Sequence, residues 1–389
     1  MIALKLAIRN LTGAKLRTFL NAAVLSFAFV VLVFYMGLLD GWNRQSKLDM
    51  EAWEIGEGQL WSKSYDPFDP YSLQDAHSII PTSYNSEIDR GNITPILLVQ
   101  GSIYRQGTLI NIIISGIEPK QRLLKIPSRV LKSESKEVPA IIGSRFAKVN
   151  GIKKGDYVQI RWRDKNGTFD ALDVEICNIF KTNVSTVDNN RIWIPIKRLQ
   201  EMSGLLKEAT ILVTSNPNID MPPTDWIFRD KKYLEKEIDN IIFAKKRGSI
   251  VVTILLLSIG LLAIFDTQVL SIFRRQKEIG TYIALGMTRM EVVKLFTLEG
   301  SIHSIFALIL ATIYGLPLLA LIASTGIPMP SAVDEMGVSI GEKIFPYYEI
   351  GVLIVSVLIM VLAATTVSYF PSRRIGRLNP IDALKGKIK

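Results

Sequence analysis

Side chains that could catalyse a reaction are sparse in this chain, and their spacing matches no catalytic pattern. The 389 residues include one cysteine and two histidines. Cys177 has no histidine near it, and His77 and His303 are far apart, so neither a Cys–His nucleophile nor a metal-ligand cluster is indicated. The G-x-S-x-G and H-E-x-x-H patterns of hydrolases are also absent. We therefore predict no catalytic residue and no metal site.

Nucleotide chemistry is not indicated either. The phosphate-cradling pattern G-x-x-x-x-G-K-[ST] does not occur. We predict that this chain binds no cofactor and is not an enzyme, and that any ATP and Mg²⁺ that drive it are bound by a separate ATPase subunit.

Four apolar stretches determine what kind of protein this is. No charged residue occurs in residues 18–39, 248–265, 300–333 or 350–372. A helix rises 1.5 Å per residue, so about 20 apolar residues cross a hydrocarbon core about 30 Å thick. We predict four membrane spans, at residues 18–39, 248–273, 300–325 and 350–371. The first stretch is too long for a signal peptide, and no small-residue cleavage site follows it.

Cationic side chains indicate the orientation of these spans. Lys and Arg are concentrated in residues 1–17, which we predict to be an amphipathic helix, in the elbow 274–299 and in the basic tail 372–389. The loop 326–349 is acidic, with Lys343 as its one cation. Because cationic loops stay cytoplasmic, we predict that both termini and the elbow face the cytoplasm. The net charge of +10 then lies at the inner membrane face, and nucleic acid binding is not indicated.

The segment 40–247 is predicted to be one extracytoplasmic α+β domain carried on two helical stalks. Alternating apolar residues indicate strands, and DKNG (164–167) between two of them is a hairpin signal. The predicted fold is therefore a four-span helical membrane protein, N-in and C-in, with a large α+β domain between the first two spans. The segments read as strands are ITPILLVQGSIY, TLINIIISG, YVQIRWR, FDALDVEICNIF and EATILVTS, and RIWIPIKRLQEMSG is read as a strand running into a helix.

Small side chains in the first and last spans suggest close helix packing, against sibling spans or a second membrane subunit. These residues are Ala22, Ser26, Ala363, Ala364 and Ser368.

Two other residues of the spans are notable. Pro317 should kink the third span. Asp266 is read either as a buried functional charge or as an interfacial residue at the cytoplasmic end of the second span, and we favour the interfacial interpretation.

The charged elbow begins with a helix. Gln276–Leu285 is compatible with a helix on which Ile279, Tyr282 and Ile283 form an apolar stripe. Gly286 suits the left-handed position that ends a helix. Apolar positions at an aqueous membrane edge suggest that something docks there.

The elbow continues with a second helix. Thr288 is a predicted N-cap, and Glu291 three residues later completes a capping box. Two spans can be joined by a handful of polar residues, so an elbow of this design suggests a function beyond connection.

The elbow also carries a family resemblance. RRQKEIGTYIALGMTRMEVVKLFTLEG resembles the conserved segment of FtsX-like permeases, the membrane subunits of MacB/LolCDE-type ABC transporters. The start LKLAIRNLTGAKLRTFLN and the tail PSRRIGRLNPIDALKGK resemble the family's two ends. The matching residues are Arg275, Glu278, Ile279, Gly280, Ala284, Leu285, Gly286, Glu299, Gly300, Pro371, Arg373, Arg374, Pro380, Ala383 and Leu384.

The resemblance implies a mechanism called mechanotransmission. Two permeases, identical or different, pair in the membrane and bind two cytoplasmic ABC ATPases, whose closure moves the elbow as a coupling helix. The stalks relay that motion to the outer domain, where the substrate is handled. Glu299 would support the elbow from the start of the third span. The residues implied at or near the ATPase contact are Glu278, Gly280, Ala284, Leu285, Gly286, Met287 and Arg289.

Within the family we favour the lipoprotein-releasing LolC/LolE type, in a bacterial inner membrane, with lipoprotein cargo and a periplasmic carrier as further partners. MacB-type exporters usually carry a fused N-terminal ATPase, which we expect to be absent here. One alternative is a split MacB-like exporter of peptides or antibiotics. Another is an FtsX-type division protein that activates cell-wall hydrolases, although those generally have a smaller outer domain.

Overall fold

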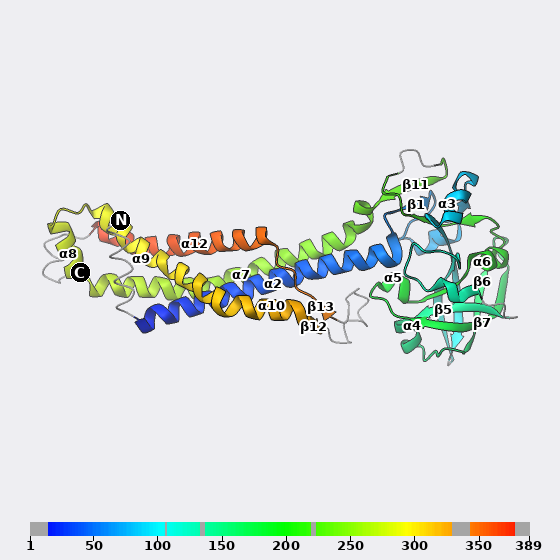
Figure 1. The fold of residues 1–389 in the computed structure, drawn as a ribbon, viewed down its shortest axis with the longest axis horizontal. Coiled ribbons are helices and arrows are strands. Elements are labelled where there is room, and N and C mark those ends of the chain that lie inside the picture. The colour runs from blue at the N-terminus through cyan, green and yellow to red at the C-terminus, as the bar shows by residue number, and fades with distance from the viewer. Residues whose placement is uncertain (1–14, 106, 133–136, 219–222, 329–342, 378–389) are drawn as a thin grey trace. The chain divides into compact units, whose positions relative to one another are not determined.

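The structure is a computed structural model that describes residues 15–105, 107–132, 137–218, 223–328 and 343–377 (Figure 1). The predicted helix over residues 1–17 falls almost entirely outside these residues, and so does the tail from residue 378. The chain divides into two compact units. The helical unit comprises Met1–Trp42, Ile242–Ile327 and Phe345–Lys389, and the β-rich unit comprises Asn43–Ile241 and Pro328–Ile344.

In the part of the chain that the structure describes, four helices are long and apolar enough to cross a membrane, as the sequence predicted. The chain is therefore a helical membrane protein with a large β-rich region between its first and second spans, and the orientation stays a prediction. The helices concerned are α2 (Lys15–Met50), α7 (Lys231–Arg274), α9 with α10 (Arg289–Leu310 and Leu316–Thr325) and α12 (Ile350–Ser372).

Small side chains let these helices pack closely. Ala22, Ser26, Ala364 and Ser368 are buried and Ala363 is half-buried. A Cβ atom on Gly300 of α9 would lie 2.1 Å from Ser368 Oγ of α12, so only glycine allows this approach. The small residues of α2 and α12 therefore serve packing within this chain.

The third span contains an irregular turn instead of a simple kink. A π-helical turn, η5 (Ala311–Gly315), separates α9 from α10, and Pro317 stands in the first turn of α10. Proline has no N–H to donate to the preceding turn, and a π turn is one way to accommodate it. Tyr314 of this turn forms a hydrogen bond with Ser26 of α2, 3.1 Å between the hydroxyl oxygens.

The β-rich unit is built on a nine-stranded sheet in the order β11-β1-β10-β3-β4-β8-β5-β7-β6. Short two-stranded pairings join β2 (Ser78–Ile79) to β9 (Glu208–Ala209), and β12 (Ile327–Pro328) to β13 (Lys343–Ile344). The strands of the large sheet are β1 (Gly58–Ser62), β3 (Ile93–Arg105), β4 (Thr108–Ile117), β5 (Val138–Gly143), β6 (Tyr157–Arg163), β7 (Phe169–Phe180), β8 (Arg191–Pro195), β10 (Ile211–Thr214) and β11 (Trp226–Asp230).

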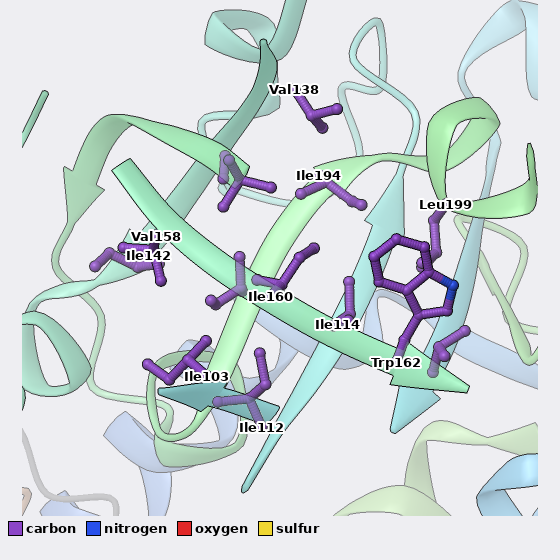
Figure 2. Packing of buried hydrophobic residues seen from close by; sticks show 14 of the residues in the cluster. Ile103, Ile112, Ile114, Val138, Ile142, Val158, Ile160, Trp162, Ile194 and Leu199 are labelled. Atoms are coloured by element: carbon purple, nitrogen blue, oxygen red, sulfur yellow. The ribbon is translucent and has the colours of Figure 1, made fainter. Parts of the chain in front are cut away.

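An additional pairing of β3 with β6 closes part of this sheet into a barrel of β3, β4, β8, β5, β7 and β6. Gly101 of β3 stands opposite Trp162 of β6. A Cβ atom on Gly101 would lie 2.7 Å from the Arg161 carbonyl oxygen, so the seam depends on glycine. Aliphatic side chains and Trp162 fill the core, pointing toward one another between the strands (Figure 2).

The predicted strands are present, although EATILVTS is divided into β9 and β10, and β6 and β7 coincide with their predicted segments. The predicted hairpin turn lies between them, with Gly167 at a φ of 86°. Short helices complete the unit: α3 (Asn85–Arg90), α4 (Ser144–Val149), α5 (Ser185–Asp188) and α6 (Ile196–Ser203), and the 3₁₀ turns η2 (Pro70–Gln74), η3 (Thr82–Tyr84) and η4 (Ser128–Lys132).

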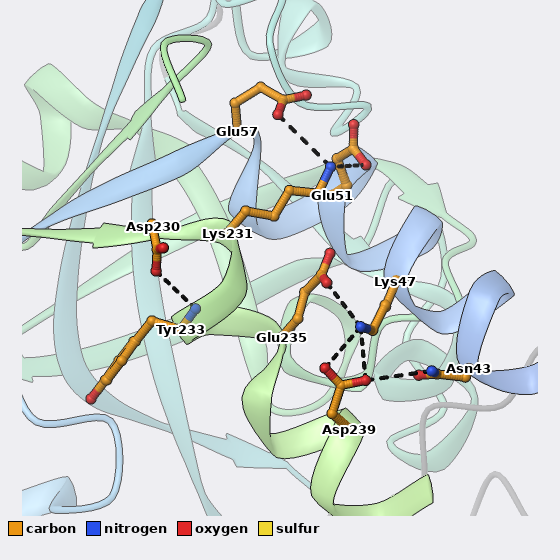
Figure 3. A network of polar contacts seen from close by, with 9 residues as sticks. All are labelled: Asn43, Lys47, Glu51, Glu57, Asp230, Lys231, Tyr233, Glu235 and Asp239. Atoms are coloured by element: carbon orange, nitrogen blue, oxygen red, sulfur yellow. Dashed lines mark hydrogen bonds and ion pairs between the residues drawn. The ribbon is translucent and has the colours of Figure 1, made fainter. Parts of the chain in front are cut away.

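Ion pairs connect the ends of α2 and α7 within the β-rich unit (Figure 3). Lys47 lies 3.1 Å from Glu235 and 2.7 Å from Asp239. Lys231 lies 2.5 Å from Glu51, in a π-helical turn, η1 (Glu51–Ile55), that follows α2. The two segments predicted as stalks are thus helical and paired side by side here.

Candidate functional site

The elbow begins with helix α8 (Gln276–Ala284), which lies at one end of the helical unit (Figure 1). Its end is a Schellman motif, in which the Gly286 N–H donates to the Ile283 carbonyl and the Met287 N–H to the Tyr282 carbonyl. Gly286 has a φ of 101°, a backbone conformation that residues with a side chain rarely adopt. The predicted glycine break is therefore confirmed.

Helix α9 starts with the predicted capping box. The Glu291 N–H donates to Thr288 Oγ1, and the Thr288 N–H donates to the Glu291 carboxylate at 2.8 Å. Two helix termini thus meet across a turn of four residues, and local hydrogen bonds satisfy some of the backbone groups that each terminus leaves free. The turn is held in one conformation by these bonds.

The apolar stripe of α8 faces inward, which differs from the docking surface that the sequence suggested. Ile279 is fully buried against Val292 and Phe296 of α9, with Tyr282 and Ile283 packed partly against the same cluster. A C-terminal turn, η6 (Arg373–Arg377), closes the cluster with the buried Ile375. Burying this stripe fixes α8 onto α9, so the stripe cannot bind a partner unless the elbow opens.

An ion pair fastens the beginning of the elbow to α9. Arg275 donates from Nη1 to both carboxylate oxygens of Glu299, at 3.1 and 2.9 Å, and from Nε to Glu278 at 2.7 Å. The guanidinium also stacks on Phe296, 4.9 Å from the ring centroid. The Glu299 side chain is 7% exposed and the Glu278 side chain 54% exposed, so the inner bond is shielded from solvent and the outer one is not.

The residues implied as ATPase contacts divide into two groups. Glu278, Ala284, Leu285, Gly286 and Arg289 are exposed. Gly280 is buried and Met287 is half-buried in the apolar cluster, so their side of the backbone faces α9. Glu299 lies in α9 and accepts two hydrogen bonds from Arg275 at the start of the elbow, a position from which it can support the elbow.

Two side chains give the tip of the elbow an apolar surface. Leu285 is 80% exposed and Met290 is 56% exposed, on either side of the turn. Among the described residues nothing covers these two apolar side chains, and exposed apolar groups of this kind can mark a binding surface. Chemically, the elbow can offer a rigid apolar projection with the charged Glu278 and Arg289 beside it.

Reasoning from sequence did not single out Arg275 as a support, nor the contact between Arg289 and the C-terminal turn. Arg289 donates to the Gly376 carbonyl at 3.2 Å. The spacing of three between Arg275 and Glu278 on a helix was the available signal for the outer ion pair. Glu299 is too far along the chain for any spacing rule to pair it with Arg275.

Other polar groups of the helical unit lie apart from the elbow tip. Asp266 is exposed on α7, so it is not a buried charge within the described residues, and its depth in the membrane stays a prediction. Among the described residues, no cluster of histidine, cysteine and carboxylate side chains is arranged to hold a metal ion. Cys177 is half-buried in β7, and burial raises the pKa of its thiol.

Comparisons with known proteins concern the C-terminal third of the chain. Residues 250–380 match the family described as FtsX-like permease C-terminal. An uncharacterized ABC transporter permease of Methanocaldococcus jannaschii is 31% identical over 131 residues, which are 34% of this chain and 30% of that protein. The chain thus matches less than a third of that relative's length. These two similarities support the FtsX-like family, and the family match covers α8, α9 and α12.

Proposed function

We propose that this chain is the permease subunit of an ABC transporter of the mechanotransmission type, and that its elbow is the contact for a separate ATPase subunit. The similarity to FtsX-like permeases and to an ABC transporter permease supports the class of protein. In this proposal ATP is hydrolysed by the partner, and this chain converts the partner's motion into motion of its own helices.

The structure of the elbow is the observation that carries the proposal. A coupling element has to present a surface to its partner and pass displacement on without deforming. Leu285 provides an exposed apolar surface, while the Schellman motif and the capping box hold the turn. The ion pair of Arg275 with Glu299 and the buried Ile279 join α8 to α9, so a push on the tip is carried into the third span.

The test is co-purification of an ATPase with variants of Leu285. Leu285→Asp should abolish the association while leaving the protein inserted and folded, because the side chain makes no buried contact. Leu206→Asp is the matched control, since Leu206 is an exposed leucine of the β-rich unit at 64% exposure. If ATPase recovery is the same with Leu285→Asp as with the unmodified chain, the coupling assignment is wrong.

Within this class we propose lipoprotein release as the specific activity, with a second permease, identical or different, in the complex. The support is the size of the β-rich unit, residues 43–241, which suits the lipoprotein-releasing branch better than division-type FtsX proteins. Mass spectrometry of the purified complex tests it. Lipidated proteins with an ATPase and a second permease support release, whereas a cell-wall hydrolase or its activator would replace it with division signalling.

A further inference from the structure

The β-rich unit contains a cavity of about 650 Å³, within the usual range for small-molecule sites. It lies between the sheet, the π-helical turn η1 and the first turns of α7. All its lining residues belong to the β-rich unit. Nothing in the proposed coupling mechanism uses this cavity.

Aromatic side chains form much of the wall. Trp53 comes from η1, Trp61 from β1 and Trp193 from β8, so half of the chain's six tryptophans line one cavity. Trp61 Nε1 donates to Gln59 and Trp193 Nε1 donates to the Val187 carbonyl. Trp61 is 9% exposed and Trp193 is 1% exposed, whereas Trp53 is half-buried, so Trp53 offers most of the indole surface that an apolar ligand body could contact.

One cation in this wall lacks hydrogen-bond partners. Arg191 stands two residues before Trp193 on β8, on the same face of the strand. Its guanidinium lies 5.3 Å from the Trp193 ring centroid, and within the described part of the chain it makes no hydrogen bond or ion pair. Burial lowers the pKa of Arg191, which the nearby Glu54 and Tyr65 partly oppose. Five N–H donors in a fixed plane are thus available to a ligand.

The other charged groups of the wall do not occupy this guanidinium. Glu54 lies in the same wall, and among the described residues no hydrogen bond or ion pair joins it to Arg191. Lys236 and Glu237 are neighbours on α7 and bring one charge of each sign. The wall therefore contains one arginine, Arg191, whose N–H donors have no hydrogen-bond partner among the described residues, and aromatic rings surround it.

We propose that this cavity binds an amphipathic small molecule that carries one carboxylate or phosphate group on an apolar body. The anionic group pairs with Arg191 in the bidentate geometry that guanidinium favours, and the apolar body lies against Trp53 with Trp61 beside it. A free carboxylic acid and a phosphate-headed lipid share this chemistry. The inference does not depend on the coupling role of the elbow.

Tryptophan fluorescence of the full chain in lipid nanodiscs tests the proposal, with 8-bromooctanoic acid as a quenching probe. We expect saturable quenching, and an affinity for 8-bromooctan-1-ol, the neutral analogue, that is about ten- to a hundredfold weaker, because the alcohol cannot form a charge-assisted pair. Arg191→Gln should weaken binding of the acid by a similar factor. Arg161→Gln, an exposed arginine of β6, is the matched control and should change nothing.

Two further experiments distinguish the two kinds of ligand and test whether a loss of binding comes from misfolding. Displacement of the probe at lower concentration by octyl phosphate than by octanoate assigns a phosphate-headed ligand, and the reverse order assigns a carboxylate. Arg191→Lys keeps the charge but loses the planar fork, so its affinity should fall between those of the unmodified chain and Arg191→Gln. The proposal is overturned by unsaturable quenching, by equal affinity for acid and alcohol, or by unchanged binding in a folded Arg191→Gln variant.

Discussion

Arg275 and Glu299 are paired through two hydrogen bonds, although 24 residues separate them in the sequence. The pair joins the point where the second span ends to the first helix of the third span, and Phe296 covers the guanidinium. Because the second span ends at Arg274, whatever moves α9 also pulls on the end of α7 through this pair.

Glu299→Gln should destabilise the elbow more than Glu278→Gln does. Glutamine keeps an amide oxygen near the guanidinium but removes the inner charge, so the half-buried guanidinium retains only its exposed charged partner, at a cost of about 1–3 kcal/mol. Glu278 is the exposed partner, where solvent screens the pair and little stability is lost. Thermal unfolding in detergent, compared between the two variants, measures the difference. Equal melting temperatures would mean that the inner bond does not hold the elbow together.

Gly286→Ala should destabilise the turn through the backbone alone. No atom lies within 4 Å of the Cβ position, so the cost comes from the φ of 101° and amounts to about 1–2 kcal/mol. Gly248→Ala is the control, and it should change the stability in the opposite direction. Its Cβ position on α7 is also open, and alanine in a helix stabilises by about 0.5–1 kcal/mol. Hydrogen exchange of residues 282–291 should accelerate only in the first variant, and unchanged protection would contradict the strained turn.

Local signals explain what could be predicted from the sequence. The pattern of YVQIRWR and FDALDVEICNIF, with DKNG between them, is a complete hairpin within one short segment. The capping box of Thr288 and Glu291 is equally local. Pairing between distant strands has no such local signal. Gly101 and Trp162 come together only when the barrel closes, so the periodicity of neither strand predicts their pairing.

The candidate site was predictable to the same extent. The sequence indicates helix, glycine turn and second helix, because each signal spans a few residues. The direction of the apolar stripe depends on Val292, Phe296 and Ile375, which come from two other segments. An amphipathic helix has the same pattern whether its apolar face meets its own chain or a partner.

Acid should weaken the β-rich unit through Asp156. The Lys153 N–H and the Arg105 guanidinium both donate to its carboxylate, and they lower the pKa of Asp156. A carboxyl whose pKa is depressed by folding contributes stability that is fully present above the ordinary aspartate pKa. This contribution is lost as the pH falls through the lower folded value.

In the Asp156→Asn variant, the free energy of unfolding should therefore fall less between pH 7 and pH 3 than it does in the unmodified chain. Unfolding of the full chain between pH 7 and pH 3 measures it, with Asp173→Asn, an exposed carboxylate of β7, as the control. Asp156→Asn should lower stability at neutral pH and narrow the gap to the unmodified chain in acid. A gap that widens in acid would show that the sign is wrong.

The orientation of the spans can be tested by placing single cysteines on the two units. In a Cys177→Ser background, Leu285→Cys puts a thiol on the exposed elbow tip, and Lys165→Cys puts one on the exposed hairpin turn between β6 and β7. The concentration of cations around the elbow predicts that it is cytoplasmic. A membrane-impermeant maleimide added to intact cells should then label position 165 and spare position 285. Permeabilised cells should label both positions when no ATPase subunit covers the elbow, which shows that each thiol is reactive. Because one span, in α7, lies between the two positions along the chain, labelling of 285 alone in intact cells would invert the whole topology and remove the elbow from the reach of a cytoplasmic ATPase.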